Sequence, residues 1–225
     1  MKKKRCVLCD FEFEYDDKVN ESVFVRPYGE GAEYYHDLWH FHVDKCPNCG
    51  YASRDISHTY NKLITHDESY KAIGDISIIV ELNEVRPNRV EAYMKAAYYY
   101  DSISDIYNSG RCLLQAGDLV YAELLYWDEY VFNSKDSLSA LVSQAQYKEL
   151  KKFADHLYNS AIQRLEDFVK EEPNHVDAWL LLAGSLLDGD KVQVIRGTRM
   201  LSSIADMDLT DKQRAALDFL KNDVR

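Results

Sequence analysis

Two Cys-x-x-Cys pairs restrict what this chain can fold into more than any other feature of its sequence. The first pair is Cys6 and Cys9, the second is Cys46 and Cys49, and 36 residues lie between them. In such a pair the two-residue spacing lets a tight turn point both sulfur atoms at one ion. Four thiolates in this arrangement are typical of a structural zinc site. We therefore predict zinc as the cofactor and these four cysteines as its ligands.

The residues between the pairs predict a small sheet. Residues 10–15 alternate apolar with acidic side chains, and residues 39–43 alternate in the same way with histidine in the polar role. Residues 27–31 hold proline and glycine, which favour a turn. We call each Cys-x-x-Cys turn a knuckle. A zinc ribbon consists of a knuckle, a strand, a turn, a second strand and a second knuckle, and we expect one over residues 1–54. A segment this short buries too little apolar surface to fold alone, so its zinc should be structural.

Two alternative chemistries stay open in this module. The cysteine pairs could be redox-active, although a redox Cys-x-x-Cys is usually a single pair in a thioredoxin-like setting. His36, His40 and His42 fall on one face of the strand predicted around residues 39–43. Three imidazoles on one side could hold a second metal, or could form the polar face of a half-buried strand.

The charge of the chain bears on its partners. The formal net charge is −11, from 27 basic and 38 acidic residues. Residues 1–55 contribute 8 basic and 11 acidic residues, or −3, and the rest contributes 19 and 27, or −8. Nucleic-acid affinity comes mostly from neutralised phosphates, so this balance argues against nucleic acid. We expect a protein or peptide partner, and a basic peptide suits the charge. The basic residues 2–5 are either phosphate contacts or a solvated tail.

The sequence also predicts a compartment. No apolar run approaches the ~18 residues of a membrane span, and residues 1–5 lack the hydrophobic segment of a secretory signal. We expect a cytoplasmic protein without membrane contact, where paired cysteines mean metal more often than disulfides. The fifth cysteine, Cys112, lies in a helical context, so we expect a buried small hydrophobe rather than a reactive thiol.

The cysteine motifs resemble those of a bacterial family. Residues 6–9, with aromatic residues after them, and an aromatic-rich segment ending in Cys-Pro-Asn-Cys-Gly-Tyr at residues 46–51 are similar to the family catalogued as domain of unknown function 2225. That family has a cysteine-rich N-terminus ahead of tetratricopeptide-like helices. The resemblance implies a bacterial cytoplasmic protein whose metal ligands are Cys6, Cys9, Cys46 and Cys49. It implies no activity.

The rest of the sequence has the period of helices. Over residues 55–86 we expect connecting helices, because Ile56, Tyr60, Leu63 and Ile64 recur at helical spacing and Thr65 begins a capping box. Over residues 87–225 we expect a tetratricopeptide-like α-solenoid of helical hairpins. The predicted fold class is therefore mainly α, with a small N-terminal β zinc-ribbon module.

An internal match supports the helical repeats. Pro-Asn-Arg-Val-Glu-Ala-Tyr at residues 87–93 reappears as Pro-Asn-His-Val-Asp-Ala-Trp at residues 173–179, which is 86 residues later. In both copies we expect the asparagine to cap a helix and the acid to lie in its first turn. The separation is about two and a half units of a 34-residue repeat. We therefore place a turn between two helices at Gly117-Asp118, another turn at residues 188–190, and a capping box for the last helix at Thr210.

Two features of the helical part stay open. Residues 138–172 contain no glycine or proline, so this stretch is either one long helix or a hairpin. The aromatic runs at residues 98–100 and 126–130 cannot all face inward from adjacent helix positions. Some of these rings should line a surface, as in a peptide-binding groove, although packing between helices accounts for most of them.

Three functions follow from these patterns. The first is an interaction scaffold with a structural zinc site, an acidic helical groove and no catalysis of its own. The second is nucleic-acid binding through the ribbon, with residues 2–5 and Arg54 on phosphates. The third is a thiol or zinc redox sensor, or an enzyme that uses the histidine face. We rank the scaffold first because four thiolates leave zinc no open position for water, which catalytic zinc needs.

Overall fold

The computed structural model describes residues 2–15, 30–39, 42–73, 87–126 and 137–223. Within these ranges the protein is mainly α-helical with a small N-terminal β module, as the sequence predicts. The elements in chain order are β1 (Lys2–Arg5), β2 (Glu12–Tyr15), α1 (Glu30–Trp39), β3 (Asp44–Lys45), β4 (Ala52–Ser53), the 3-10 turn η2 (Ile64–His66), α2 (Glu68–Ala72), α3 (Pro87–Ser102), α4 (Ile106–Tyr126), α5 (Ser137–Glu171), α6 (Val176–Leu187), α7 (Lys191–Ile204) and α8 (Asp211–Asp223).

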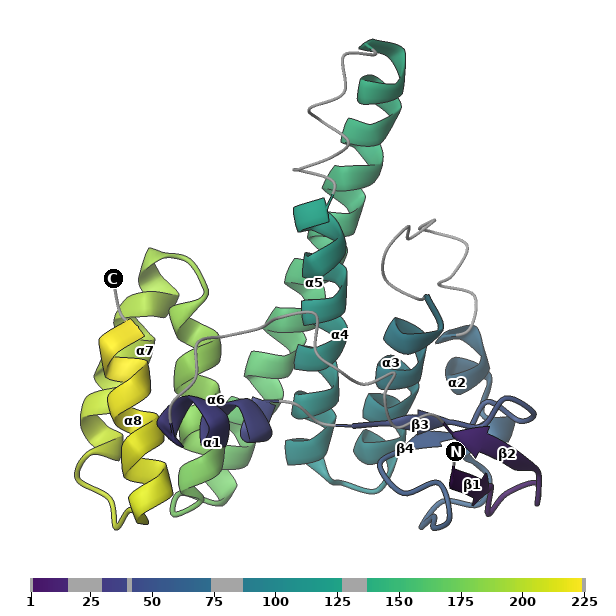
Figure 1. Ribbon diagram of the computed structural model, residues 1–225, viewed down its shortest axis with the longest axis horizontal. Helices are drawn as coiled ribbons and strands as arrows, with labels where there is room; N and C mark the ends of the chain where they lie inside the picture. Colours follow the sequence, from purple (N-terminus) through teal and green to yellow (C-terminus); the bar gives the residue numbers. More distant parts are fainter. Residues whose placement is uncertain (1, 16–29, 40–41, 74–86, 127–136, 224–225) are drawn as a thin grey trace.

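The elements form three groups along the molecule (Figure 1). The β module, α2 and α3 lie at one end, α6, α7 and α8 lie at the other, and the long helices α4 and α5 stand between them. Helix α1 packs against α6 and α8, far from the β module that precedes and follows it in the sequence. The segment between the two cysteine pairs thus carries a helix to the opposite end of the molecule.

Helix α1 replaces a predicted strand. The strand expected at residues 39–43 is wrong, because Trp39 ends α1 and β3 begins only at Asp44; residues 40 and 41 lie outside the described ranges. The side chains buried along α1 follow a spacing of three and four, which makes one stripe on a helix: Ala32, Tyr35, Leu38 and Trp39. Gly31 permits close packing on α8, since a β-carbon there would stand 2.0 Å from the carbonyl oxygen of Ala215.

Helix α4 passes straight through the predicted Gly117-Asp118 turn, so that prediction is also wrong. Gly117 makes room for an aromatic ring instead. A β-carbon on it would stand 3.1 Å from Cε2 of Tyr158 on α5. Asp118 accepts hydrogen bonds from the Tyr158 hydroxyl and from the indole N–H of Trp39 at the end of α1. The glycine and the carboxylate therefore join α1, α4 and α5 rather than ending a helix.

The connecting region differs from the prediction as well. Residues 55–63 form turns rather than a helix, with Ile56 buried and with Tyr60 and Leu63 exposed. The capping residue of α2 is Asp67 and not Thr65, because the Asp67 side chain accepts from two backbone N–H groups of the first turn. Most of the helix expected to follow, through residue 85, lies outside the described ranges.

The two copies of the internal match each begin a helical hairpin, α3 with α4 and α6 with α7. The expected asparagine caps are wrong, since Asn88 lies inside α3 and the side chain of His175 caps α6. The turn at residues 188–190 and the capping box at Thr210 are confirmed. Residues 137–171 are one continuous helix of 35 residues, which settles the choice left open at residues 138–172. A repeating solenoid stays a prediction.

The helices share a core of leucine and alanine side chains. Cys112 belongs to it and is fully buried, as predicted, and this burial raises the pKa of its thiol. No helix in the described ranges is both long enough and apolar enough to cross a membrane.

Candidate metal centre

The four predicted ligand cysteines converge on one point. Cys6 and Cys9 lie in the turn between β1 and β2, and Cys46 and Cys49 lie in the turn between β3 and β4. The Sγ atoms of Cys6 and Cys49 are 3.6 Å apart, as are those of Cys9 and Cys46, and all four sulfur atoms lie within 4.8 Å of one another. Tetrahedral zinc with Zn–S bonds of ~2.3 Å requires sulfur separations of about 3.8 Å. The sulfur cluster therefore has the dimensions of a zinc site.

The two knuckles are copies of one structure, offset by 40 residues. In the first, the Cys6 N–H donates to the Phe11 carbonyl oxygen and the Cys6 carbonyl oxygen accepts from the Asp10 N–H. In the second, Cys46 makes the same two bonds with Tyr51 and Gly50. The strand registers agree too, since Arg5 pairs with Glu12 and Lys45 pairs with Ala52. Two equivalent hairpins thus face each other across the sulfur cluster.

The fourth residue after the first cysteine has a positive φ in both knuckles. This residue is Asp10 in the first, with φ 56°, and Gly50 in the second, with φ 74°. Glycine adopts this left-handed region freely, and aspartate tolerates it better than most residues. At Gly50 the space is limited as well, because a β-carbon would stand 3.3 Å from Nζ of Lys95.

We expect Gly50→Ala to destabilise the zinc-loaded protein by about 1–2 kcal/mol, the cost of a side chain in the left-handed region. Asp10→Gly is the matched control at the equivalent position, and its effect should stay within about 0.5 kcal/mol because its side chain is exposed. Urea unfolding measures both. Equal stability of Gly50→Ala and the wild type would contradict the knuckle geometry.

The thiols differ in how readily they ionise. Burial raises the pKa of Cys6 and Cys49. At Cys9 burial acts in the same direction, but hydrogen bonds, led by one from the Asn48 side chain, bring its pKa down to about 7. A zinc ion has to displace the protons that the buried thiols retain. Zinc affinity should therefore fall as the pH falls.

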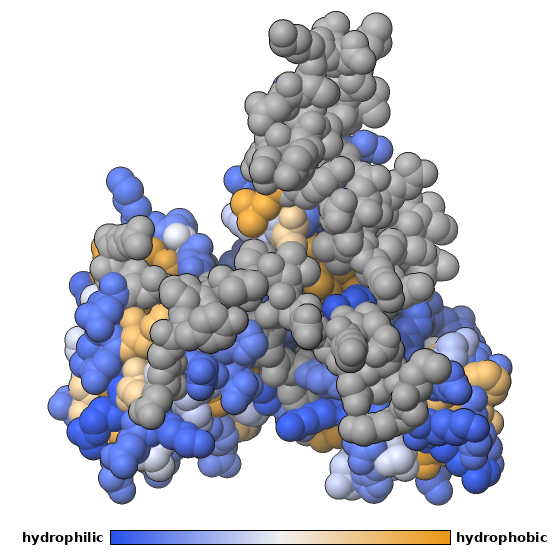
Figure 2. Space-filling model, in the orientation of Figure 1, coloured by the Kyte–Doolittle hydropathy of each residue, from blue (hydrophilic) through white to orange (hydrophobic). Residues whose placement is uncertain are grey.

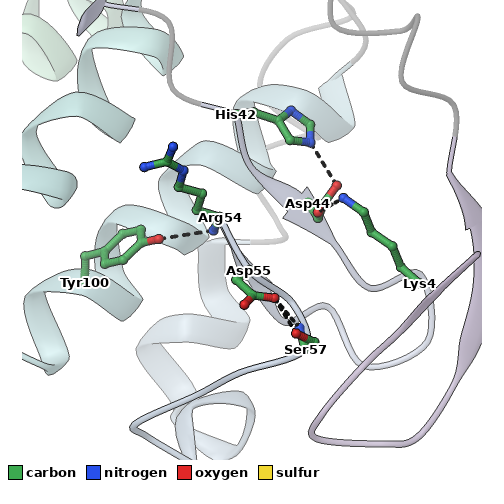
Figure 3. Close-up of polar contacts among 7 residues, drawn as sticks. All are labelled: Lys4, His42, Asp44, Arg54, Asp55, Ser57 and Tyr100. Atoms are coloured by element: carbon green, nitrogen blue, oxygen red, sulfur yellow. Dashed lines mark hydrogen bonds and ion pairs between the residues drawn. The ribbon is translucent and has the colours of Figure 1, made fainter. Parts of the chain in front are cut away.

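Two tyrosines of α3, Tyr99 and Tyr100, dock the β module on this helix, and the preceding Tyr98 contacts the start of α2. The Tyr51 ring of the second knuckle is fully buried and meets the Tyr99 ring edge-on at 5.3 Å between centroids. The Tyr100 hydroxyl accepts from the Arg54 N–H at 3.1 Å (Figure 3), and the Tyr98 hydroxyl donates to Asp67 at 3.2 Å. The tyrosines at 98–100 therefore pack against the module and α2 rather than line a groove. Of the aromatic run at residues 126–130, residues 127–130 lie outside the described ranges. The β module packs on the helical body.

A buried ion-pair triad makes the second link to α3. The Glu91 carboxylate accepts from Nζ of Lys45 on β3 at 2.5 Å and from Nζ of Lys95 on α3 at 2.6 Å. Glu91 and Lys95 are each only 8% exposed. Burial opposes ionisation of Glu91, but the two lysines outweigh it and lower the pKa of the carboxyl group. Lys95 also lies 5.4 Å from the centre of the Tyr70 ring, next to the second knuckle.

Tyr70 on α2 makes two hydrogen bonds to the backbone of the second knuckle. Its hydroxyl donates to the Gly50 carbonyl oxygen at 3.0 Å and accepts from the Ala52 N–H at 2.9 Å. The side chain is buried, and burial raises its pKa far above the usual range, so the hydroxyl stays protonated as a donor. Sequence reasoning missed Tyr70, Glu91 and Lys95. A signal existed for the last two, because an acid and a base four residues apart on one helix face form an ion pair.

Asp44 joins the two hairpins near the sulfur cluster (Figure 3). Its buried carboxylate lies between the ammonium group of Lys4 on β1 and the imidazole of His42, whose Nε2 is 2.9 Å away. The predicted histidine face does not form. His36 lies on α1 and His42 precedes β3, while His40 lies outside the described ranges. In the described part of the chain, the four cysteines are the one cluster of three or more metal-ligating groups.

Comparisons with known proteins gave no match for this chain, whether against protein-family models, curated proteins or solved structures. Membership of the bacterial family that the motifs resemble therefore stays a prediction. The structure itself shows a four-cysteine cluster on small β-hairpins, followed by a helical body.

Proposed function

We propose that this protein is an interaction scaffold in which one structural zinc ion fixes the β module against the helical body. The observation that carries the proposal is the convergence of four cysteine sulfurs from two equivalent hairpins. Four thiolates complete the coordination of zinc and leave no position for a reacting water. The ion would then position a surface rather than perform chemistry.

The charge of the chain favours a protein or peptide partner with basic groups. The net charge is −11, and an acidic surface attracts cationic segments at long range. In the view of Figure 2, hydrophilic side chains cover most of the described surface and the hydrophobic patches are small and separate. A partner held on such a surface depends on charge, so its affinity should fall as salt rises.

If the protein is a scaffold, exposed acidic residues on its helices should contribute to binding of the partner. Asp155→Lys and Glu172→Lys reverse two exposed charges, on α5 and just after it, and should each weaken a stoichiometric protein partner several-fold at low salt. Lys148→Glu on α5 is the matched control and should weaken nothing. The measurement is affinity purification followed by titration of the purified partner. A partner whose affinity survives every charge reversal on the helical body would count against the proposal.

The nucleic-acid alternative is weakened by the β1–β2 register. Lys3 lies opposite Glu14, Arg5 lies opposite Glu12, and Lys4 pairs with Asp44. Three of the four basic residues, Lys3, Lys4 and Arg5, therefore lie beside acids that offset their charge. We expect no binding of single- or double-stranded DNA or RNA even at low salt, where phosphate contacts are strongest. Tight binding under those conditions would restore this alternative.

Zinc content and thiol count after peroxide treatment test whether the cysteines act as a redox sensor. A thiol switch would lose zinc when mild peroxide converts the cysteines to disulfides. We expect the zinc content and the four protected thiols to stay unchanged after such treatment. Release of zinc together with loss of thiols would favour a sensor.

A further inference from the structure

The two hairpins of the β module are related by pseudo-symmetry, and within the described ranges only the second packs its knuckle against α3. Three residues of the second hairpin that lie against α3 have equivalents of similar position in the first hairpin, 40 residues earlier. Tyr51 corresponds to Phe11, Lys45 to Arg5, and Gly50 to Asp10. The backbone that presents them is the same in both hairpins. A helix that fits one face therefore finds similar geometry at the other.

The second knuckle shows what such a face binds. Helix α3 presents Glu91, Lys95 and Tyr99 at intervals of four residues, which places them on one side of the helix. Glu91 pairs with Lys45, Nζ of Lys95 lies beside Gly50, and the Tyr99 ring packs against Tyr51. The pattern that docks is thus Glu-x-x-x-Lys-x-x-x-Tyr on a helix.

The same three kinds of contact are available on the first knuckle. Phe11 is 43% exposed, whereas its equivalent Tyr51 is fully buried. The neighbouring Val7 is 40% exposed. The side chains of Arg5 and Asp10 are 60% and 77% exposed and form an ion pair with each other at 3.2 Å. Arg5 offers a cation where Lys45 meets Glu91, and Asp10 offers an acid where Lys95 approaches Gly50.

Two contacts also attach the first hairpin to neighbouring segments, and a surface that is already ordered loses little freedom on binding. The Val7 N–H donates to the Ile56 carbonyl oxygen at 3.1 Å, and Lys4 pairs with the buried carboxylate of Asp44. Single exposed apolar residues are common on protein surfaces. Phe11, however, lies beside Arg5 and Asp10, and the equivalents of all three in the second hairpin lie against the one helix α3.

We propose that the face formed by Arg5, Val7, Asp10 and Phe11 binds an amphipathic helix of a partner protein that carries the Glu-x-x-x-Lys-x-x-x-Tyr pattern. A second copy of this chain is not the occupant, because Glu91, Lys95 and Tyr99 of its α3 are buried against its own second knuckle. The inference rests on the proposed scaffold function and identifies one surface and one class of partner for it.

A synthetic helical peptide of residues 87–102, with both ends blocked, is the probe. Titrated into the isotope-labelled, zinc-loaded full chain, it should shift the amide signals of residues 5–11 with a dissociation constant below about 1 mM. Phe11→Ser and Arg5→Glu should each weaken binding at least about tenfold. A peptide with lysine at the Glu91 position should recover affinity for Arg5→Glu. Leu63→Ser, which alters another exposed apolar residue, should change nothing.

Two results would overturn this inference. The first is a peptide that leaves residues 5–11 unshifted at about 1 mM or binds Phe11→Ser as tightly as the wild type. The second is a concentration-dependent dimer in sedimentation that Phe11→Ser dissociates, because the occupant would then be a second copy. Either result leaves zinc content and the charge-dependent partner of the helical body untouched, so it is distinguishable from failure of the scaffold proposal.

Discussion

Cys46→Ser is expected to lose stoichiometric zinc and to unfold the β module. Cys46 is fully buried in the turn between β3 and β4 and supplies one of the four sulfurs. Zinc contributes roughly 10–16 kcal/mol to the folding of small zinc-finger peptides, and losing one ligand should remove several kcal/mol of that. Hydrogen exchange should show lost protection in residues 42–73 and along α3. Helices α6 to α8, at the other end of the molecule, should keep theirs.

Cys112→Ala is the control for this prediction. Cys112 is as deeply buried as Cys46 but lies on α4 and outside the sulfur cluster. Its replacement should cost about 1 kcal/mol through the lost sulfur contacts and leave one zinc per chain. Wild-type zinc content in Cys46→Ser, or loss of zinc in Cys112→Ala, would show that the cluster is not the metal site.

Glu91→Gln is expected to destabilise the zinc-loaded protein by about 3–5 kcal/mol at pH 7. The change removes the carboxylate that two lysines share in a site where Glu91 and Lys95 are 8% exposed. Breaking a buried ion pair on one side leaves an uncompensated buried charge, here that of Lys95, and the partly exposed Lys45 loses its partner as well. Glu149→Gln, which breaks an exposed pair with Lys152, should stay within about 0.5 kcal/mol. Urea unfolding compares the three proteins.

The effect of Glu91 has a defined pH dependence. The folded-state pKa of Glu91 is lowered, so its ion pairs stabilise the protein above the unfolded pKa of about 4.3 and lose that effect as pH falls through the folded value. The stability difference between wild type and Glu91→Gln should be the same at pH 7 and pH 6, and should shrink below about pH 4. A difference that grows on acidification would contradict the triad.

The four-cysteine cluster is the part of the structure that local sequence could predict. Ligand spacing within each knuckle spans only four residues, and the chemistry of thiolates limits the ion. The sequence also shows that the two knuckles are alike and 40 residues apart. A cationic residue precedes each one, Arg5 and Lys45, and an aromatic residue follows each one, Phe11 and Tyr51. The helical nature of the remaining chain followed from its hydrophobic period in the same local way.

The errors arose where distant contacts override local signals. Gly117 favours a turn locally, but its lack of a side chain serves the ring of Tyr158, 41 residues away in the sequence. Alternation around residues 39–43 suggested a strand, whereas the burial of Tyr35, Leu38 and Trp39 against other helices makes the segment helical up to Trp39. Tyr99 and Tyr100 of α3 are buried because the β module packs on them, and no local pattern encodes that partner.

X-ray absorption at the zinc edge of the purified full chain shows whether four cysteine sulfurs hold the ion. We predict one zinc per chain with four sulfur neighbours at ~2.3 Å and no nitrogen or oxygen in the first coordination shell. Protein without stoichiometric zinc, or zinc with a nitrogen or oxygen ligand in place of a sulfur, would contradict it.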